Sequence, residues 1–330
     1  MYTRRSALQG NVRLKVRLYR HPDGISAVDC EYLYPGHAAA HIIVDSGRAA
    51  FVDVGTNSSV AYLLAGLAEL GVPRKAVDYV LLTHVHLDHA GGAGTLMREL
   101  PNAVALLHPR GAPHMIDPSK LIAGSRAVYG ERLEALYGTL VPIPTERVRP
   151  VADGERVTLG ARTLELIHVP GHALHHYAVV DGAHRCIFAG DTFGISYRAL
   201  DTERGAFITP TTPPSQFDPD QLIASIDRLL SYRPESMYLM HFSRVTDVPR
   251  LGELLKMQVS EFARIARAHA HDTDPAASIR AAMLELWLDL LHRHGSPLKR
   301  GEIEAVLEND LTLNTQGLMV WLERLNRHSH

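Results

Sequence analysis

The sequence predicts an α/β fold whose strands form two packed layers, followed by a C-terminal region made only of helices. Apolar runs of strand length fall into two groups along the chain, with helical patterns between and after them. From Pro249 onward, every apolar stripe has helical spacing. We therefore expect a catalytic domain over residues 1–248 and a helical extension packed on it over residues 249–330.

The bulk composition disfavours several classes of protein. The chain has 330 residues, 46% hydrophobic and 21% charged, with a formal net charge of −2. No basic field favours a nucleic-acid partner, and no stretch reaches the roughly 18 apolar residues that would span a membrane. The two cysteines are far apart in sequence, and no apolar region follows the polar N-terminus. We expect a cytoplasmic protein with neither a nucleic-acid nor a membrane partner.

The first half of the chain contains strands and helices in alternation. Ser46-Gly47 predicts a hairpin turn, and Asn57, Ser58 and Gly71 offer caps for the helix that follows. In chain order we expect a half-buried strand over 12–19, a hairpin over 40–54, a helix over 60–70, a strand over 79–82, a helix over 95–100 and a strand over 103–107.

The second half begins with a mixed, helical segment over 111–137. Residues 193–217 lack periodicity and contain several prolines, and a loop of this length is usually functional. We further expect strands over 156–159, 163–169, 177–181, 185–189 and 237–240, a helix after Asp218-Pro219, and helices after Pro249.

A cluster of potential metal ligands follows the apolar strand 79–82. His84, His86, Asp88 and His89 fall within six residues. Imidazole nitrogen and carboxylate oxygen are ligands that Zn²⁺, Fe and Mn all use. Alternate residues point the same way, so His84 and His86 can share one ion, while Asp88 and His89 come after the turn and can face a second ion. The alternative is a polar turn in which Asp88 caps a helix.

Four side chains cannot complete two metal sites, so further ligands must come from other strand ends. His172, Asp191 and His241 each follow the end of a predicted strand. A single histidine in such a place is more often structural, but His172 and Asp191 also come directly after a glycine. All three could therefore converge with the first cluster on one rim. The other histidines near strands are expected to be structural: His37, His41, His108, His114, His168 and His175. As alternatives, His108 and His114 follow a strand end and could reach the pocket rim, and His175 is near enough to the ligand loop to support a ligand.

Taken in order, these residues resemble the metallo-β-lactamase fold superfamily over roughly Val12 to Arg244. The resemblance implies a four-layer αββα sandwich with two divalent ions at its rim, expected to be Zn²⁺ with Fe or Mn as alternatives. It implies one ion on His84, His86 and His172, a second on Asp88, His89 and His241, and Asp191 as the bridge. It also implies that Asp53 orients the histidine cluster without being a ligand, although Asp53 could instead form a turn before Gly55.

The resemblance implies metal-assisted hydrolysis without a covalent protein nucleophile. Two ions would hold a hydroxide between them and polarise the substrate's carbonyl or phosphoryl oxygen. Asp88 could accept a hydrogen bond from that nucleophile. Tyr197, in the loop after Asp191, could donate one to a developing oxyanion, although such a tyrosine is more often part of a pocket wall.

Among the branches of the superfamily, the glyoxalase II-like hydrolases share the ligand set and a C-terminal helical region. They read Gly-His-Thr-x-Gly-His where this chain has Gly171-His172-Ala173-Leu174-His175-His176, so His176 matches and His175 departs. The secreted β-lactamases often use a cysteine ligand, and the tRNA-processing nucleases carry an RNA-gripping arm that is not visible here. We therefore expect hydrolysis of a thioester, lactone or other ester in a small molecule, with a phosphodiesterase or nuclease as a weaker alternative.

A second class on this fold consists of di-iron proteins that bind or reduce oxygen. They usually carry a flavodoxin domain, for which the sequence shows no counterpart, and their ligand set is richer in carboxylates. A binding protein with an inert metal site is a third class, which the complete ligand set disfavours. Specificity is expected in the loop after Asp191, in the insertion over 111–137 and in the terminal helices, which could cover the pocket or form a homodimer face.

Overall fold

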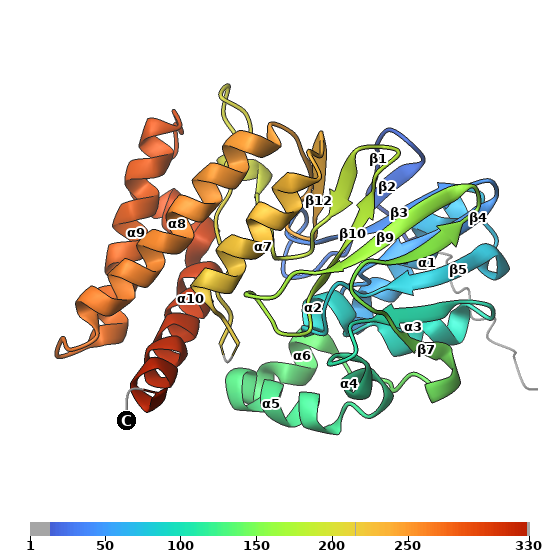
Figure 1. Cartoon of the computed structure of the whole chain (residues 1–330), viewed down its shortest axis with the longest axis horizontal. Helices are drawn as coiled ribbons and strands as arrows, with labels where there is room; N and C mark the ends of the chain where they lie inside the picture. The colour runs from blue at the N-terminus through green and yellow to red at the C-terminus, as the bar shows by residue number, and fades with distance from the viewer. Residues whose placement is uncertain (1–13, 215, 329–330) are drawn as a thin grey trace, which may run out of the picture.

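The computed structural model describes residues 14–214 and 216–328, and it contains two β-sheets packed face to face between helices (Figure 1). The first sheet is hydrogen-bonded in chain order. Its seven strands are β1 (Leu18–Arg20), β2 (Ile25–Asp29), β3 (Ala39–Asp45), β4 (Arg48–Val52), β5 (Val77–Leu81), β6 (Val104–Leu107) and β7 (Val148–Pro150).

The second sheet has six strands, arranged β13-β12-β11-β10-β9-β8. Its strands are β8 (Glu155–Leu159), β9 (Arg162–His168), β10 (Tyr177–Asp181), β11 (Cys186–Phe188), β12 (Ser236–Leu239) and β13 (Ser243–Val245). β4 to β7 are parallel to one another, and β11 is parallel to β12. Parallel neighbours end at the same edge of a sheet, so the loops after these strands meet at a common rim.

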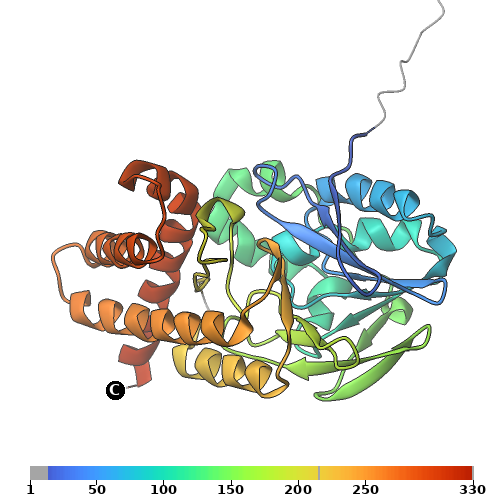
Figure 2. The same ribbon diagram turned by 90° about the horizontal axis from the view of Figure 1, so that it is seen from above.

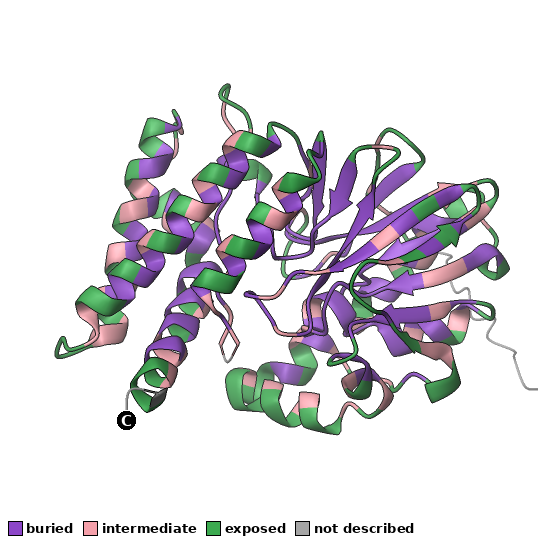
Figure 3. Cartoon of the chain, viewed as in Figure 1, coloured by how far each residue is buried: buried purple, intermediate pink, exposed green. Residues whose placement is uncertain are grey.

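Three buried clusters define four layers, and they confirm the predicted αββα architecture. One cluster lies between the two sheets and contains Tyr177 and Phe188. A second joins the first sheet to α1 (Val60–Glu69) and α3 (Ala93–Glu99). A third joins the second sheet to α7 (Pro219–Ser231) and α8 (Val248–His269). Figure 3 shows the buried residues running along the strands and the inward sides of these helices.

The helical C-terminal region is present as predicted, and α8 is followed by α9 (Pro275–Arg293) and α10 (Arg300–His328). These helices gather at one end of the molecule beside α7 (Figures 1 and 2). Trp287 is fully buried, its Nε1 donates to Gln258 Oε1 at 3.0 Å, and Trp321 belongs to the same core cluster. In the part of the chain that the structure describes, no helix is long and apolar enough to cross a membrane.

Most predicted elements are confirmed, including the hairpin at Ser46-Gly47, where both residues have positive φ, and the helical insertion. The insertion contains α4 (Ala112–Ile116), α5 (Ser119–Tyr129) and α6 (Leu133–Tyr137). The N-cap prediction is wrong, because a 3₁₀ turn over Asn57–Ser59 precedes α1 and Thr56 is the residue that caps this turn.

The N-terminal strand is shorter than predicted and begins at Leu18. Val12 lies outside the described residues and Leu14 is 43% exposed, so of the alternating apolar residues before β1 only Val16 packs, partly buried, against the core. Three strands escaped prediction: β2, β7 and β13. All five residues of β2 are buried, Ser26 and Asp29 among them, so this strand has no alternation to recognise.

Candidate metal centre

All seven predicted ligands meet at the rim formed by the strand ends. His84 and His86 come from the turn between β5 and α2 (Leu87–Ala90), Asp88 and His89 come from α2 itself, and the other three come from the loops after β9, β11 and β12. Their side-chain nitrogen and oxygen atoms form three overlapping groups, within each of which the atoms lie no more than 4.8 Å apart. The groups are His84, His86 and His172; His84, His89 and Asp191; and Asp88, His89 and His241.

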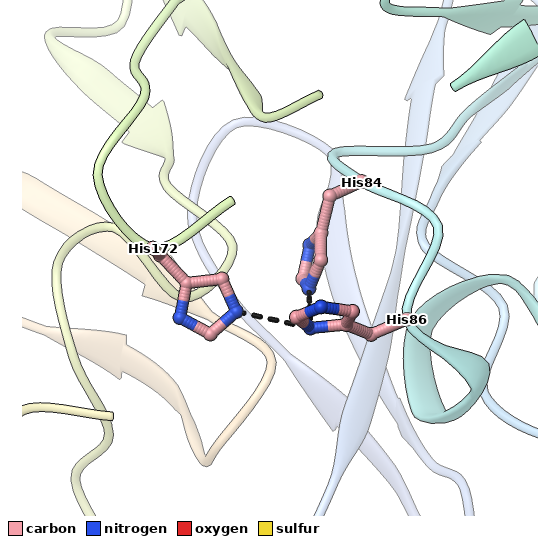
Figure 4. A group of neighbouring side chains, drawn as sticks. All are labelled: His84, His86 and His172. Carbon is pink, nitrogen blue, oxygen red and sulfur yellow. Dashed lines mark hydrogen bonds between the residues drawn. The ribbon is translucent and has the colours of Figure 1, made fainter. Parts of the chain in front are cut away.

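The first group consists of three imidazoles that face one another (Figure 4). His86 Nδ1 lies 2.9 Å from His84 Nε2 and 3.0 Å from His172 Nε2. In a tetrahedral zinc site, nitrogens about 2.0–2.1 Å from the ion are roughly 3.3 Å from each other. The three nitrogens therefore approach the spacing that one tetrahedral ion requires.

A second ligand group, Asp88, His89 and His241, lies beside the first, and Asp191 connects the two. Asp88 Oδ2 lies 3.2 Å from His241 Nε2 and 3.9 Å from His89 Nε2. The side chain of Asp88 is 23% exposed, whereas that of His89 is fully buried. Asp88 can therefore contact both an ion and a molecule in solution.

Asp191 lies between the two groups and turns one carboxylate oxygen toward each. Its Oδ1 is 3.2 Å from His89 Nε2, and its Oδ2 is 3.5 Å from His172 Nε2. Asp191 Oδ1 and His89 Nε2 are both buried, and neither has a hydrogen-bond partner among the described residues despite this short separation. A cation shared by the two atoms would satisfy both of them.

The orientation of the imidazoles also fits metal ions. Four of the five histidines place their other ring nitrogen against an oxygen, which fixes the proton there and leaves a lone pair facing the neighbouring ligands. The pairs are His84 Nδ1 with Thr83 Oγ1 (3.1 Å), His89 Nδ1 with Asp53 Oδ2 (2.9 Å), His172 Nδ1 with the Thr211 carbonyl (3.2 Å) and His241 Nδ1 with the His37 carbonyl (2.8 Å).

The electrostatics of the two groups differ. Burial and the neighbouring His172 lower the pKa of His86 to about 3, so the first group is neutral. Burial alone would lower the pKa of His89, but Asp191, Asp53 and Asp88 outweigh it and raise that pKa well above its ordinary value. Burial also lowers the pKa of His241, but the hydrogen bond to Asp88 and the negative charges of Asp191 and Asp88 together outweigh burial and raise that pKa. The second group therefore retains protons when no cation is bound.

Asp53 makes the contacts predicted for an orienting residue. Its Oδ1 accepts hydrogen bonds from the Thr83 amide (2.8 Å) and hydroxyl (3.0 Å), while its Oδ2 faces His89. Its φ of +54° also makes it part of the turn after β4. Asp53 thus positions both the ligand loop and one ligand ring, and it touches neither the cavity nor the reacting atoms.

Two other histidines support the ligands. His176, the one that matches the family motif, accepts a hydrogen bond from the Asp191 amide (3.2 Å) and stacks on His84 with ring centroids 4.6 Å apart. His37 was expected to be purely structural, but its carbonyl holds His241 and its ring stacks on Tyr197. Backbone carbonyls such as those of His37 and Thr211 carry no signal in a sequence.

A cavity of about 450 Å³ opens over the two groups and has walls from distant parts of the chain. One wall comes from the insertion, with Leu121, Val128, Tyr129, Leu136 and Tyr137, and the opposite wall comes from α10, with Asn309, Asp310, Thr312, Leu313 and Gln316. Tyr197 also lines the cavity, and its hydroxyl donates to Asp310 Oδ1 at 3.3 Å. Its predicted role at an oxyanion stays a prediction.

The chain belongs to the metallo-β-lactamase superfamily: the family described as "Metallo-beta-lactamase superfamily" matches residues 33–241. It is 25% identical over 232 residues to the metallo-beta-lactamase fold-containing protein ST1585 of Sulfurisphaera tokodaii, covering 69% of this chain and 81% of that protein. The crystal structure of ST1585 aligns with this chain at a TM-score of 0.59, and the alignment covers 73% of this chain and 87% of ST1585.

Two further relatives extend the comparison. The family protein TTHA1429 from Thermus thermophilus is 21% identical with a TM-score of 0.66, and 92% of this chain and 94% of that one are covered, so the shared fold reaches into the terminal helices. A hydroxyacylglutathione hydrolase of Cupriavidus metallidurans is 30% identical over 203 residues, which is 60% of this chain and 56% of that enzyme. The chain thus spans little more than half the length of this hydrolase.

Proposed function

We propose that this protein is a dinuclear metal-dependent hydrolase that cleaves an ester-like bond, in a thioester, lactone or other ester, of a small molecule. The observation that carries the proposal is Asp191, whose two oxygens face two separate ligand groups. The similarity to a hydroxyacylglutathione hydrolase supports hydrolysis as the reaction type.

We assign the seven residues to two ions by their proximity to one another. His84, His86 and His172 would hold one divalent ion, Asp88, His89 and His241 would hold the other, and Asp191 would touch both. The nitrogen and oxygen donors suit Zn²⁺, and they also suit Fe or Mn. When bound, such a pair supplies an activated water as nucleophile and polarises the scissile carbonyl.

The protein's own side chains can position the attacking water and hold the metal ligands in place. Asp88 faces the cavity and can accept a proton or a hydrogen bond from the attacking water. Asp53 and His176 keep His89 and Asp191 in place from behind. Tyr197 could donate to the developing oxyanion only if its hydroxyl leaves Asp310, which makes this assignment separately testable.

The cavity supports a small-molecule substrate. Its volume of about 450 Å³ lies within the range of roughly 300–1,000 Å³ that is usual for small-molecule sites. The insertion contributes the apolar side chains of Leu121, Val128 and Leu136, which suit an acyl chain or an apolar alcohol, beside the basic side chains of Lys120 and Arg132. The wall from α10 is polar and carries a carboxylate.

The proposal is tested by metal analysis, visible absorption and a substrate panel. Protein purified from its own host should contain two equivalents of metal and hydrolyse at least one member of a thioester, lactone and phosphodiester panel. Preference for the phosphodiester would redirect the assignment to a phosphodiesterase. An oxygen-sensitive iron chromophore without any esterase activity would overturn the hydrolase and favour a di-iron redox protein.

A further inference from the structure

Helix α10 is locked against the loop that follows Asp191. Asn314 is 1% exposed, its Oδ1 accepts from the Thr212 amide at 2.6 Å, and its Nδ2 donates to the Pro210 carbonyl at 3.2 Å. One turn further on, a Cβ at Gly317 would overlap the carbonyl oxygen of Thr212, so the two backbones are in close contact. Asp310 lies on the same face of α10, four residues before Asn314. The contacts of Asn314 and Gly317 with the loop therefore also fix where Asp310 lies relative to that loop.

Asp310 is a buried carboxyl group that is only half satisfied. It is 7% exposed and lines the cavity above the metal ligands. Its Oδ1 accepts from the Tyr197 hydroxyl, whereas its Oδ2 is buried and has no hydrogen-bond partner among the described residues. A buried carboxyl oxygen without a donor is costly for the folded protein, which indicates that something else supplies the donor.

Among the described residues that line the cavity, no lysine or arginine comes from the same wall as this carboxyl. The charged groups that influence Asp310 most are His241 and Asp191, and burial raises the pKa of Asp310 to about 7. The two basic side chains that line the cavity, Lys120 and Arg132, belong to the insertion on the opposite wall and are exposed to solvent. A ligand group is therefore the natural partner for Asp310 Oδ2.

We propose that Asp310, held by Tyr197, forms a subsite for a hydrogen-bond donor on the substrate, an ammonium or hydroxyl group remote from the scissile bond. Asp310 Oδ2 accepts from this group while Oδ1 keeps the Tyr197 hydroxyl. The apolar part of the substrate then lies along the insertion, toward Leu121 and Val128. This inference rests on the proposed function, because it places the scissile bond at the two ligand groups.

A binding experiment tests the subsite without turnover. Aliphatic hydroxamates of increasing length, whose far end carries an ammonium, a hydroxyl or a methyl group, would be titrated calorimetrically into the Zn²⁺-loaded full chain. The hydroxamate end binds metal in every member, so the ratio of affinities isolates the far end. We expect the best ammonium or hydroxyl compound to bind about 10-fold tighter, or more, than its methyl counterpart.

Three variants test whether Asp310 causes the preference for an ammonium or hydroxyl end group. Asp310→Leu should bring both ratios close to one, and Asp310→Asn should remove the ammonium preference but keep the hydroxyl preference. Glu323→Gln, an exposed carboxylate on the same helix that does not line the cavity, should leave both ratios unchanged. If Asp310→Leu does not fold, Asp310→Asn decides alone.

The outcomes separate the subsite from the hydrolase. Ratios near one in the wild type, ratios unchanged in the Asp310 variants, or no binding of any hydroxamate would each overturn the subsite. If instead the ratios behave as expected but no ester is hydrolysed, the proposed function fails and the subsite stands. Uniform loss of affinity for all three end groups in Asp310→Asn would show that Asp310 is only a structural partner of Tyr197.

Discussion

Asp191 Oδ1 and His89 Nε2 face each other at 3.2 Å in a buried place, yet they are not hydrogen-bonded. The other oxygen of the same carboxylate faces His172 at 3.5 Å. The side chain of Asp191 therefore connects the two ligand groups. It comes from the loop after β11, which supplies none of the other six ligands. This arrangement makes Asp191 the residue on which a two-ion site depends.

Asp191→Ala should abolish hydrolysis and lower the metal content from two ions to one or none. Loss of shared charge stabilisation worth several kcal/mol corresponds to a fall in kcat/KM on the order of 10³ or more. Metal analysis and steady-state kinetics check this, with Asp201→Ala as a control in the same loop. Full activity in Asp191→Ala would mean that the dinuclear mechanism is wrong.

The two ligand groups should bind metal with different pH dependence. The first group is already neutral, so an ion that binds there displaces no proton. In the second group the pKa values of His89 and His241 are raised, so binding there releases protons and weakens as the pH falls. Calorimetric titration with Zn²⁺ in buffers of different ionisation enthalpy measures the protons released in each step. Equal release in both steps would contradict the prediction.

Asp53→Ala should weaken metal binding by about 10–100-fold, because His89 loses the carboxylate that fixes its proton on Nδ1. The Thr83 amide also loses its acceptor, which loosens the ligand loop. Competition with a chromogenic chelator gives the affinity. Asp53→Asn is the matched control: it can still accept from Thr83 and should retain more of the fold's stability than Asp53→Ala does.

Two glycines on α10 offer a matched pair of substitutions. Gly317→Ala should destabilise the protein and widen the cavity, because the new Cβ overlaps the Thr212 carbonyl and pushes α10 away. Gly301→Ala on the same helix meets nothing within 4 Å and should be neutral or stabilising by up to about 1 kcal/mol. Thermal unfolding measures both. Equal melting temperatures for the two variants would show that α10 is not held closely at Thr212.

Asp310 should make the stability of the metal-free protein depend on pH. Its pKa rises from 3.8 to about 7 on folding, so the folded state binds more protons between these values and stability falls as the pH rises through this window. Asp310→Asn should remove this dependence and be the more stable protein at pH 8, with little difference near pH 4. Unfolding by urea at several pH values tests this. Because buried histidines add their own pH dependence to both proteins, the difference between wild type and variant is the quantity to compare. A difference that does not change between about pH 4 and pH 8 would contradict the prediction.

Much of the fold and of the ligand set could be predicted because both have local causes. The alternation of β8 and the helical stripes of α7 and α8 record which face is buried, and the run from His84 to His89 places four donors directly after a strand. β2 escaped prediction because it is buried on both faces, and the strand before Leu18 was overestimated because, within the described residues, Leu14 is exposed and Val16 is only partly buried.

By itself, the sequence determined the two layers of strands, the helical extension and the four donors from His84 to His89, because strand periodicity and ligand chemistry are properties of neighbouring residues. His172, Asp191 and His241 were predicted from their places after strand ends and from the family resemblance. Only the tertiary structure decided which oxygens hold the ligand rings and what faces the substrate. The His37 carbonyl meets His241 across 204 residues, and the Tyr197 hydroxyl meets Asp310 across 113. Such contacts depend on how whole helices and loops pack. The sequence around a backbone carbonyl or a single aspartate on a helix does not indicate which distant residue it will contact.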